Sequence, residues 1–99
     1  MGKFSLSNKA VEDLTAIWNY TYDKWSEIQA DKYYHQLIDC CDQLSIKPEI
    51  GRKYNEVDKD LLGFKILEHI IFYKIISSKE IFVVRILHSK MDLKNRIID

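Results

Sequence analysis

Two long apolar runs near the C-terminus constrain the fold of this chain more than any other feature. Residues 69–76 and residues 81–88 are rich in isoleucine, valine and phenylalanine, and only the polar tetrapeptide 77–80 separates them. β-Branched and aromatic residues favour strands, and a short polar connection between two such runs is typical of a β-hairpin. We therefore expect a largely buried antiparallel hairpin at this end of the chain.

The second run contains a charged residue, Arg85, and closes with His88. A guanidinium in an apolar strand costs free energy unless an acid pairs with it or it reaches a solvated surface. Residues three apart in a regular strand point to opposite faces, so Arg85 and His88 can act together only with a bulge or strand end at Leu87. Arg85 is thus the residue whose surroundings most need an explanation.

The first half of the chain predicts two amphipathic helices. Ser7 is a candidate N-cap, and apolar residues follow it at every third or fourth position as far as Trp25. Ser26 opens a capping box that restarts a helix, and Pro48 ends it because the residue before a proline avoids helical geometry. Since almost nothing connects the two helices, we expect them to form a hairpin.

The remaining elements complete a single domain, residues 1–99. Residues 3–6 and 62–67 are candidate strands, and residues 49–60 form a polar loop. The resulting order, β-α-α-β-β-β, predicts an α+β fold of two layers, with the helix hairpin packed on an antiparallel sheet. No apolar run approaches the roughly 18 residues of a membrane span, so we expect a cytoplasmic protein without membrane contact.

Charge and cysteine content exclude several function classes. The net charge is zero, but residues 1–50 hold five lysines against eight acids and residues 51–99 hold ten basic residues against seven acids. This balance gives no strong surplus for neutralising phosphates, so direct sequence-specific nucleic-acid binding is not expected. Cys40 and Cys41 are adjacent and lack metal-ligand spacing, so we expect two reduced apolar side chains, no metal and no cofactor.

Large aromatic residues gather on the predicted helices. Trp18, Tyr22 and Trp25 are spaced four and three residues apart on the first helix, and Tyr33 lies on the second. They either form the core between helices and sheet or partly emerge as an apolar patch that marks a protein partner.

A catalytic reading of the same chain uses three residues. His88 would act as an acid or base, while Lys65 and Arg85 would stabilise charge on a phosphate. Against it, the chain has no glycine-rich phosphate loop and no nucleophile elbow.

Several segments, taken in order, resemble a known family. Residues 48–52 read Pro-Glu-Ile-Gly-Arg and match a Pro-x-x-Gly-Arg loop, and two strand signatures match at residues 69–74 and 84–92. The helical half contributes Leu6-Ser7, Ala10, Asp13-Leu14, Ile17, Tyr20-Thr21, Trp25, Gln29-Ala30 and Tyr33. The chain resembles the ParE toxins of the RelE/ParE superfamily, which belong to bacterial type II toxin–antitoxin systems.

The resemblance implies a RelE-like fold, a ParD-like antitoxin that forms a hetero-oligomer with the toxin, and DNA gyrase as the target. It implies an inhibitor protein and not an enzyme. The predicted target-binding residues are Arg85, His88, Lys90, Met91, Lys94 and Arg96, since the tail mixes cationic and apolar side chains suited to protein contact. The predicted antitoxin-binding residues are Trp18, Tyr22, Trp25, Tyr33 and Leu37, arranged to receive an amphipathic helix.

One branch of the superfamily implies a different activity, cleavage of ribosome-bound messenger RNA by an endoribonuclease. Carried over by position, Lys65, Arg85 and His88 would then be the catalytic residues. The neutral net charge of this chain favours the gyrase reading.

Overall fold

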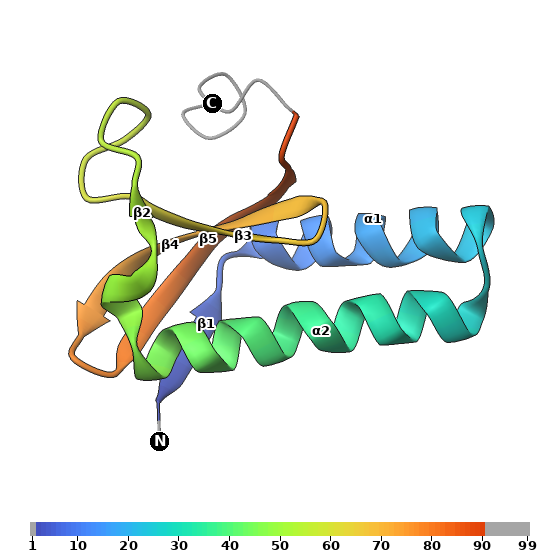
Figure 1. Cartoon of the computed structure of the whole chain (residues 1–99), viewed down its shortest axis with the longest axis horizontal. Coiled ribbons are helices and arrows are strands. Elements are labelled where there is room, and N and C mark those ends of the chain that lie inside the picture. Colours follow the sequence, from blue (N-terminus) through green and yellow to red (C-terminus); the bar gives the residue numbers. More distant parts are fainter. Residues whose placement is uncertain (1, 91–99) are drawn as a thin grey trace.

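The computed structural model describes residues 2–90, which form two α-helices, a 3-10 turn and five strands. In chain order these are β1 (Lys3–Leu6), α1 (Asn8–Lys24), α2 (Glu27–Ile46), the 3-10 turn Pro48–Ile50, β2 (Arg52–Lys53), β3 (Leu62–Ile66), β4 (His69–Ser77) and β5 (Glu80–His88). The predicted α+β fold, with a helix hairpin on one sheet, is confirmed (Figure 1).

The strands form one sheet in the order β1-β5-β4-β3-β2. Neighbours from β2 to β5 pair antiparallel, but β1 pairs parallel to β5, so the sheet is mixed and not wholly antiparallel as expected. A tight turn dictates antiparallel pairing between the strands that it joins. No such turn joins β1 to β5, and the helix hairpin that follows β1 sets its direction instead.

The predicted β4–β5 hairpin is confirmed, and its strands are one residue longer than the apolar runs, at Ser77 and Glu80. The ladder runs from the pair His69–His88 to the pair Ser77–Glu80. Its register shifts where Phe72 pairs with Arg85 and the next residue of β4 pairs with Val83, which leaves Val84 as a bulge. This bulge lies three residues before the position that the sequence suggested, and a second register shift lies between Ile75 and Ser77.

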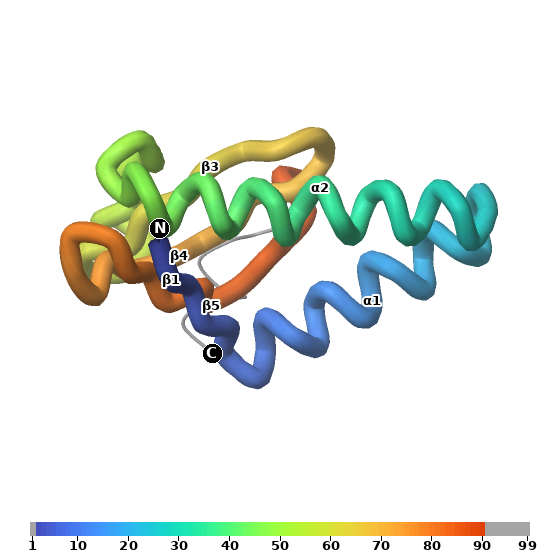
Figure 2. Tube along the Cα trace, turned by 90° about the horizontal axis from the view of Figure 1, so that it is seen from below, coloured from blue at the N-terminus to red at the C-terminus, as the bar shows by residue number. Residues whose placement is uncertain are grey.

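Both helix starts follow the capping pattern read from the sequence. The Ser7 hydroxyl accepts the N–H of Ala10 at 2.9 Å, and the Ser26 hydroxyl accepts the N–H of Gln29 at 3.1 Å. The helices lie side by side, and both views show their connecting turn projecting beyond the sheet (Figures 1 and 2). The hairpin thus offers a stretch of surface that the sheet does not cover.

The sheet has a buried cluster on each face. The cluster between helices and sheet includes Ala10, Leu14, Leu37, Leu44, Ile71, Tyr73, Ile81, Val83 and Ile86. A smaller cluster, Leu61, Ile70, Phe72 and Leu87, lies on the other face and packs against Tyr54 and Val57 of the β2–β3 connection. The segment read as a polar loop therefore contains a 3-10 turn and β2, and it covers part of the sheet.

Within residues 2–90, no helix has the length and apolarity needed to cross a membrane.

Candidate functional site

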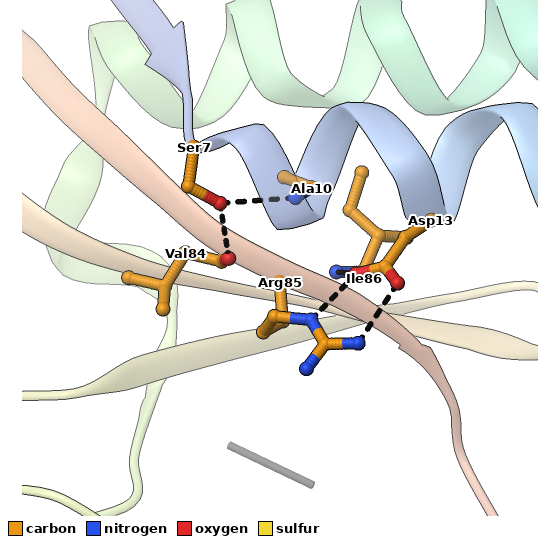
Figure 3. A network of polar contacts seen from close by, with 6 residues as sticks. All are labelled: Ser7, Ala10, Asp13, Val84, Arg85 and Ile86. Carbon is orange, nitrogen blue, oxygen red and sulfur yellow. Dashed lines mark hydrogen bonds and ion pairs between the residues drawn. The ribbon is translucent and has the colours of Figure 1, made fainter. Parts of the chain in front are cut away.

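The edge of β5 is completed by side chains of α1. Pairing with β1 ends at Val83, so the following backbone groups have no neighbouring strand on that side. The Ser7 hydroxyl donates to the carbonyl of Val84 at 2.6 Å, and the carboxylate of Asp13 accepts the N–H of Ile86 at 3.0 Å (Figure 3). Two side chains thus replace a strand, and they join the start of α1 to β5.

Arg85 is bound by the same carboxylate. Its Nε and one terminal nitrogen donate to the two Asp13 oxygens at 2.8 and 2.9 Å, in a bidentate ion pair (Figure 3). The Arg85 and Asp13 side chains are only 16% and 13% exposed, and hydrogen bonding to Asp13 raises the pKa of the guanidinium. A charge on an apolar strand is therefore explained by an internal acid, and not by a solvated surface.

The three residues of the catalytic reading lie at strand positions that belong to two different faces of the sheet. Directly paired residues share a sheet face, and His88 pairs with His69 on the face that the helices cover. Lys65 pairs with Ile70, and Arg85 pairs with Phe72, both members of the cluster on the other face. The Cβ atoms of Lys65 and Arg85 therefore lie on one face of the sheet, and the Cβ atom of His88 lies on the opposite face.

A groove of about 730 Å³ runs between the projecting part of the helix hairpin and the ends of β4 and β5. Its walls are Ala16, Ile17, Tyr20, Thr21, Trp25, Gln29, Tyr33, Glu68, His69, His88 and Lys90. Two aromatic side chains in it are widely exposed, Trp25 by 75% and Tyr20 by 58%. Large aromatic side chains with this much exposure are characteristic of surfaces that bind proteins.

One end of the groove is polar, and Tyr33 organises it. The Tyr33 oxygen accepts the N–H of Glu68 at 3.3 Å and lies 2.6 Å from Nδ1 of His69. The ring of His69 packs edge-on against that of His88, with 5.4 Å between centroids. Burial, followed by the nearby His88, lowers the pKa of His69 to about 4, so this imidazole is neutral at pH 7.

The lowered pKa of His69 makes the stability of the protein pH-dependent. Between the unfolded pKa of about 6.5 and the folded pKa of about 4, the unfolded chain binds more protons, so acid favours unfolding. We expect this group to cost about 2 kcal/mol of stability between pH 7 and pH 5. Urea unfolding at both pH values should show the loss, and His69→Gln should remove it. An equal loss in His69→Gln would contradict this prediction.

The predicted antitoxin-binding residues are divided among three places. Trp25 and Tyr33 line the groove. Trp18 lines a separate hollow of about 380 Å³, donates from Nε1 to Asp31 at 2.9 Å and stacks on Tyr22. Leu37 is completely buried in the core, so the prediction that it contacts a partner is wrong.

The predicted target-binding residues are also divided. His88 and Lys90 lie together in the groove wall, whereas Arg85 is held by Asp13. Met91, Lys94 and Arg96 lie outside the described residues. The ion pair between Arg85 and Asp13 joins α1 to β5, the strand that carries His88.

Seven residues of the groove were not among the predicted site residues, and Tyr20, Glu68 and His69 are three of them. The pairing of His69 with His88 follows from folding the two apolar runs around their short polar connection, so that contact had a signal. The bond from Tyr33 to His69 joins positions 36 apart, and it depends on how α2 crosses the sheet. Nothing in the local sequence predicts it.

The described residues hold no obvious metal site. Within residues 2–90, no group of three or more histidine, cysteine or acidic side chains is placed to hold an ion. Cys40 and Cys41 are free and buried, and burial raises the pKa of the Cys41 thiol to about 12. Neither thiol is positioned as a nucleophile or ligand, because the reactive form is the thiolate.

Comparisons with known proteins identify the family. Residues 4–93 match the family described as the ParE toxin of the type II toxin–antitoxin system parDE. Toxin ParE1 of Mycobacterium tuberculosis is 33% identical over 95 residues, covering 96% of this chain and 97% of that protein. Toxin ParE1 of Caulobacter vibrioides is 24% identical over 94 residues, covering 95% and 96%.

The fold is shared with a solved structure. A chain of the chromosomal ParDE toxin–antitoxin system from P. aeruginosa superposes with a TM-score of 0.72 at 18% identity, covering 89% of this chain and 95% of that one. At this identity the likeness concerns the fold alone. With the family match over nearly the whole length, it follows that this chain belongs to the ParE toxin family of type II toxin–antitoxin systems.

Proposed function

We propose that this protein inhibits DNA gyrase by surface contact in the cytoplasm, and that a ParD-like antitoxin neutralises it by binding in the groove. Membership of the ParE family supports the target, and a fold neighbour from a ParDE system supports the antitoxin. The single observation that carries the mode of action is the bidentate ion pair that binds the guanidinium of Arg85 to Asp13. Because an internal acid already engages this cation, the candidate groups for phosphate chemistry reduce to Lys65 and His88, and contact is the simpler mode of action.

The groove is suited to an amphipathic helix. Trp25 and Tyr20 provide exposed aromatic surface along the helix hairpin, while His69 and Lys90 provide polar groups at its other end. An apolar floor with a polar end is the usual arrangement for helix-in-groove binding. The antitoxin would bury its apolar face on α1 and α2.

The groove overlaps the surface that we propose faces gyrase, so an antitoxin bound in it would also cover part of that surface. His88 and Lys90 belong both to the groove wall and to the surface that we propose faces gyrase. A segment bound in the groove would cover these two residues. Neutralisation would then follow from direct competition for one surface, without a change of fold.

A pair of assays tests the target. Purified protein is added to a gyrase supercoiling reaction and, separately, to a translating ribosome system. We expect supercoiling to be inhibited and messenger RNA to stay intact. Message cleavage with unaffected gyrase would instead establish the ribonuclease function and overturn this proposal.

A shortened chain that ends at Lys90 tests the C-terminal tail. Full growth arrest by that chain would exclude Met91, Lys94 and Arg96 from the target surface.

A substitution in the groove tests antitoxin binding. Trp25→Ala removes the most exposed aromatic side chain of the groove, and such anchors often contribute 2 kcal/mol or more. We expect the dissociation constant of the antitoxin complex to rise about 30-fold or more. Titration calorimetry measures this. Tyr34→Ala is the matched control, because Tyr34 is also an exposed aromatic residue and is absent from the groove lining.

A further inference from the structure

The polar end of the groove contains a hydrogen-bond donor with a defined position, Nε2 of His69. The Tyr33 oxygen accepts the backbone N–H of Glu68, and we assign its proton to the contact with Nδ1 of His69, which lies 2.6 Å away. A neutral imidazole whose Nδ1 accepts carries its proton on Nε2. Tyr33 therefore fixes the tautomer of His69.

Among residues 2–90, no side chain or backbone group accepts a hydrogen bond from this donor. Within residues 2–90 the polar contact recorded for the His69 ring is the one between Nδ1 and Tyr33, and no acceptor lies against Nε2. Water satisfies such a group while the groove is open. A partner that covers His69 must supply an acceptor, since a buried N–H without one costs roughly 1–3 kcal/mol.

A second donor lies beside it on His88, and the cationic residue Lys90 lines the same groove. His88 accepts the backbone N–H of Lys90 at its Nδ1, at 3.2 Å, which places its own proton on Nε2. That Nε2 lies 4.0 Å from the carboxylate of Glu68, too far for a good hydrogen bond. The side chain of Glu68 is 71% exposed, and its negative charge lies in the same groove wall as the positive charge of Lys90.

We propose that the antitoxin segment bound in the groove places a carboxylate against Nε2 of His69, beside His88 and Lys90. This inference rests on the proposed antitoxin binding. The backbone carbonyls inside a bound helix are already paired with their own N–H groups, so the acceptor must be a side chain. The ammonium of Lys90 favours an aspartate or glutamate over an amide. The antitoxin should therefore carry apolar residues that reach Trp25 and an acid that reaches His69.

Two substitutions at one position test this inference in the complex of the full chain with its own antitoxin. His69→Phe keeps a ring of similar size and removes the donor, and we expect the dissociation constant to rise about tenfold to a hundredfold. His69→Gln keeps an N–H and should retain most of the affinity. Thermal unfolding of each variant shows that the fold persists. Equal binding by His69→Phe and the unaltered protein would overturn the carboxylate contact.

Glu68 distinguishes a carboxylate partner from a cationic one. If the antitoxin presents an acid, Glu68→Gln removes a repulsion and binding stays equal or becomes tighter. If the antitoxin instead presents lysine or arginine, Glu68→Gln weakens binding and the inference fails. Changing each antitoxin acid to its amide should reveal one whose replacement weakens binding to the unaltered protein but not to His69→Phe.

The failure of this inference is separate from failure of the proposed function. Weaker binding by Trp25→Ala with normal binding by His69→Phe would leave the groove as the antitoxin site and reject only the carboxylate. Normal binding by both variants would reject the groove itself. A ¹H–¹⁵N correlation spectrum of the His69 ring gives an independent readout. The signal of the proton on Nε2 should move downfield when the antitoxin binds, and it should stay unchanged if no acceptor approaches.

Discussion

Replacing Asp13 with alanine should destabilise this protein by about 3 kcal/mol or more, because it removes the carboxylate that binds the guanidinium of Arg85 and the N–H of Ile86. The carboxylate accepts three hydrogen bonds, two from Arg85 and one from the backbone N–H of Ile86. Both partners of the ion pair are largely buried, so water compensates poorly for the loss. Urea unfolding monitored by circular dichroism measures the change in the free energy of unfolding.

Two further variants serve as controls for the stability change expected of Asp13→Ala. Glu12 is the exposed neighbour of Asp13, and Glu12→Ala should change stability by about 0.5 kcal/mol or less. Arg85→Met removes the buried charge together with the need for its partner, so adding Asp13→Ala to it should cost much less than Asp13→Ala alone. A loss below about 1 kcal/mol in Asp13→Ala would show that the ion pair does not hold α1 against β5.

The second large effect is expected for Leu37→Ala. Leu37 is completely buried between α2 and the sheet, and leucine-to-alanine changes in cores cost about 2–5 kcal/mol. The affinity for the antitoxin, measured where the variant is fully folded, should stay unchanged because no surface is lost. Trp25→Ala should give the reverse, a loss of affinity with nearly unchanged stability. Weaker antitoxin binding by folded Leu37→Ala would show that this side chain reaches the partner.

The two variants together separate a residue that builds the groove from one that forms its surface. Sequence periodicity assigned both residues to the apolar stripes of the helices, and it does not distinguish them. The distinction arises because the helix hairpin is longer than the sheet that it covers (Figures 1 and 2). Leu37 lies over the sheet, whereas Trp25 caps the end of α1 at the projecting turn.

Local chemistry determined the elements of this protein. Ser7 and Ser26 set the helix starts through side-chain caps, and β-branched runs with a short polar connection set the β4–β5 hairpin. Each of these signals acts between residues a few positions apart, where few alternative partners compete. The family resemblance was readable for a similar reason, since it consists of short segments in a fixed order.

The contacts that shape the groove could be identified only from the tertiary structure. The pairs Asp13–Arg85 and Tyr33–His69 join residues 72 and 36 positions apart. Whether a charged or aromatic side chain is paired, buried or exposed depends on how two elements cross. Helix propensity and strand pattern do not predict how they cross. The element order could thus be read from the chain, while the internal role of Arg85 and the donor at His69 were decided only when α1 and α2 packed across the sheet.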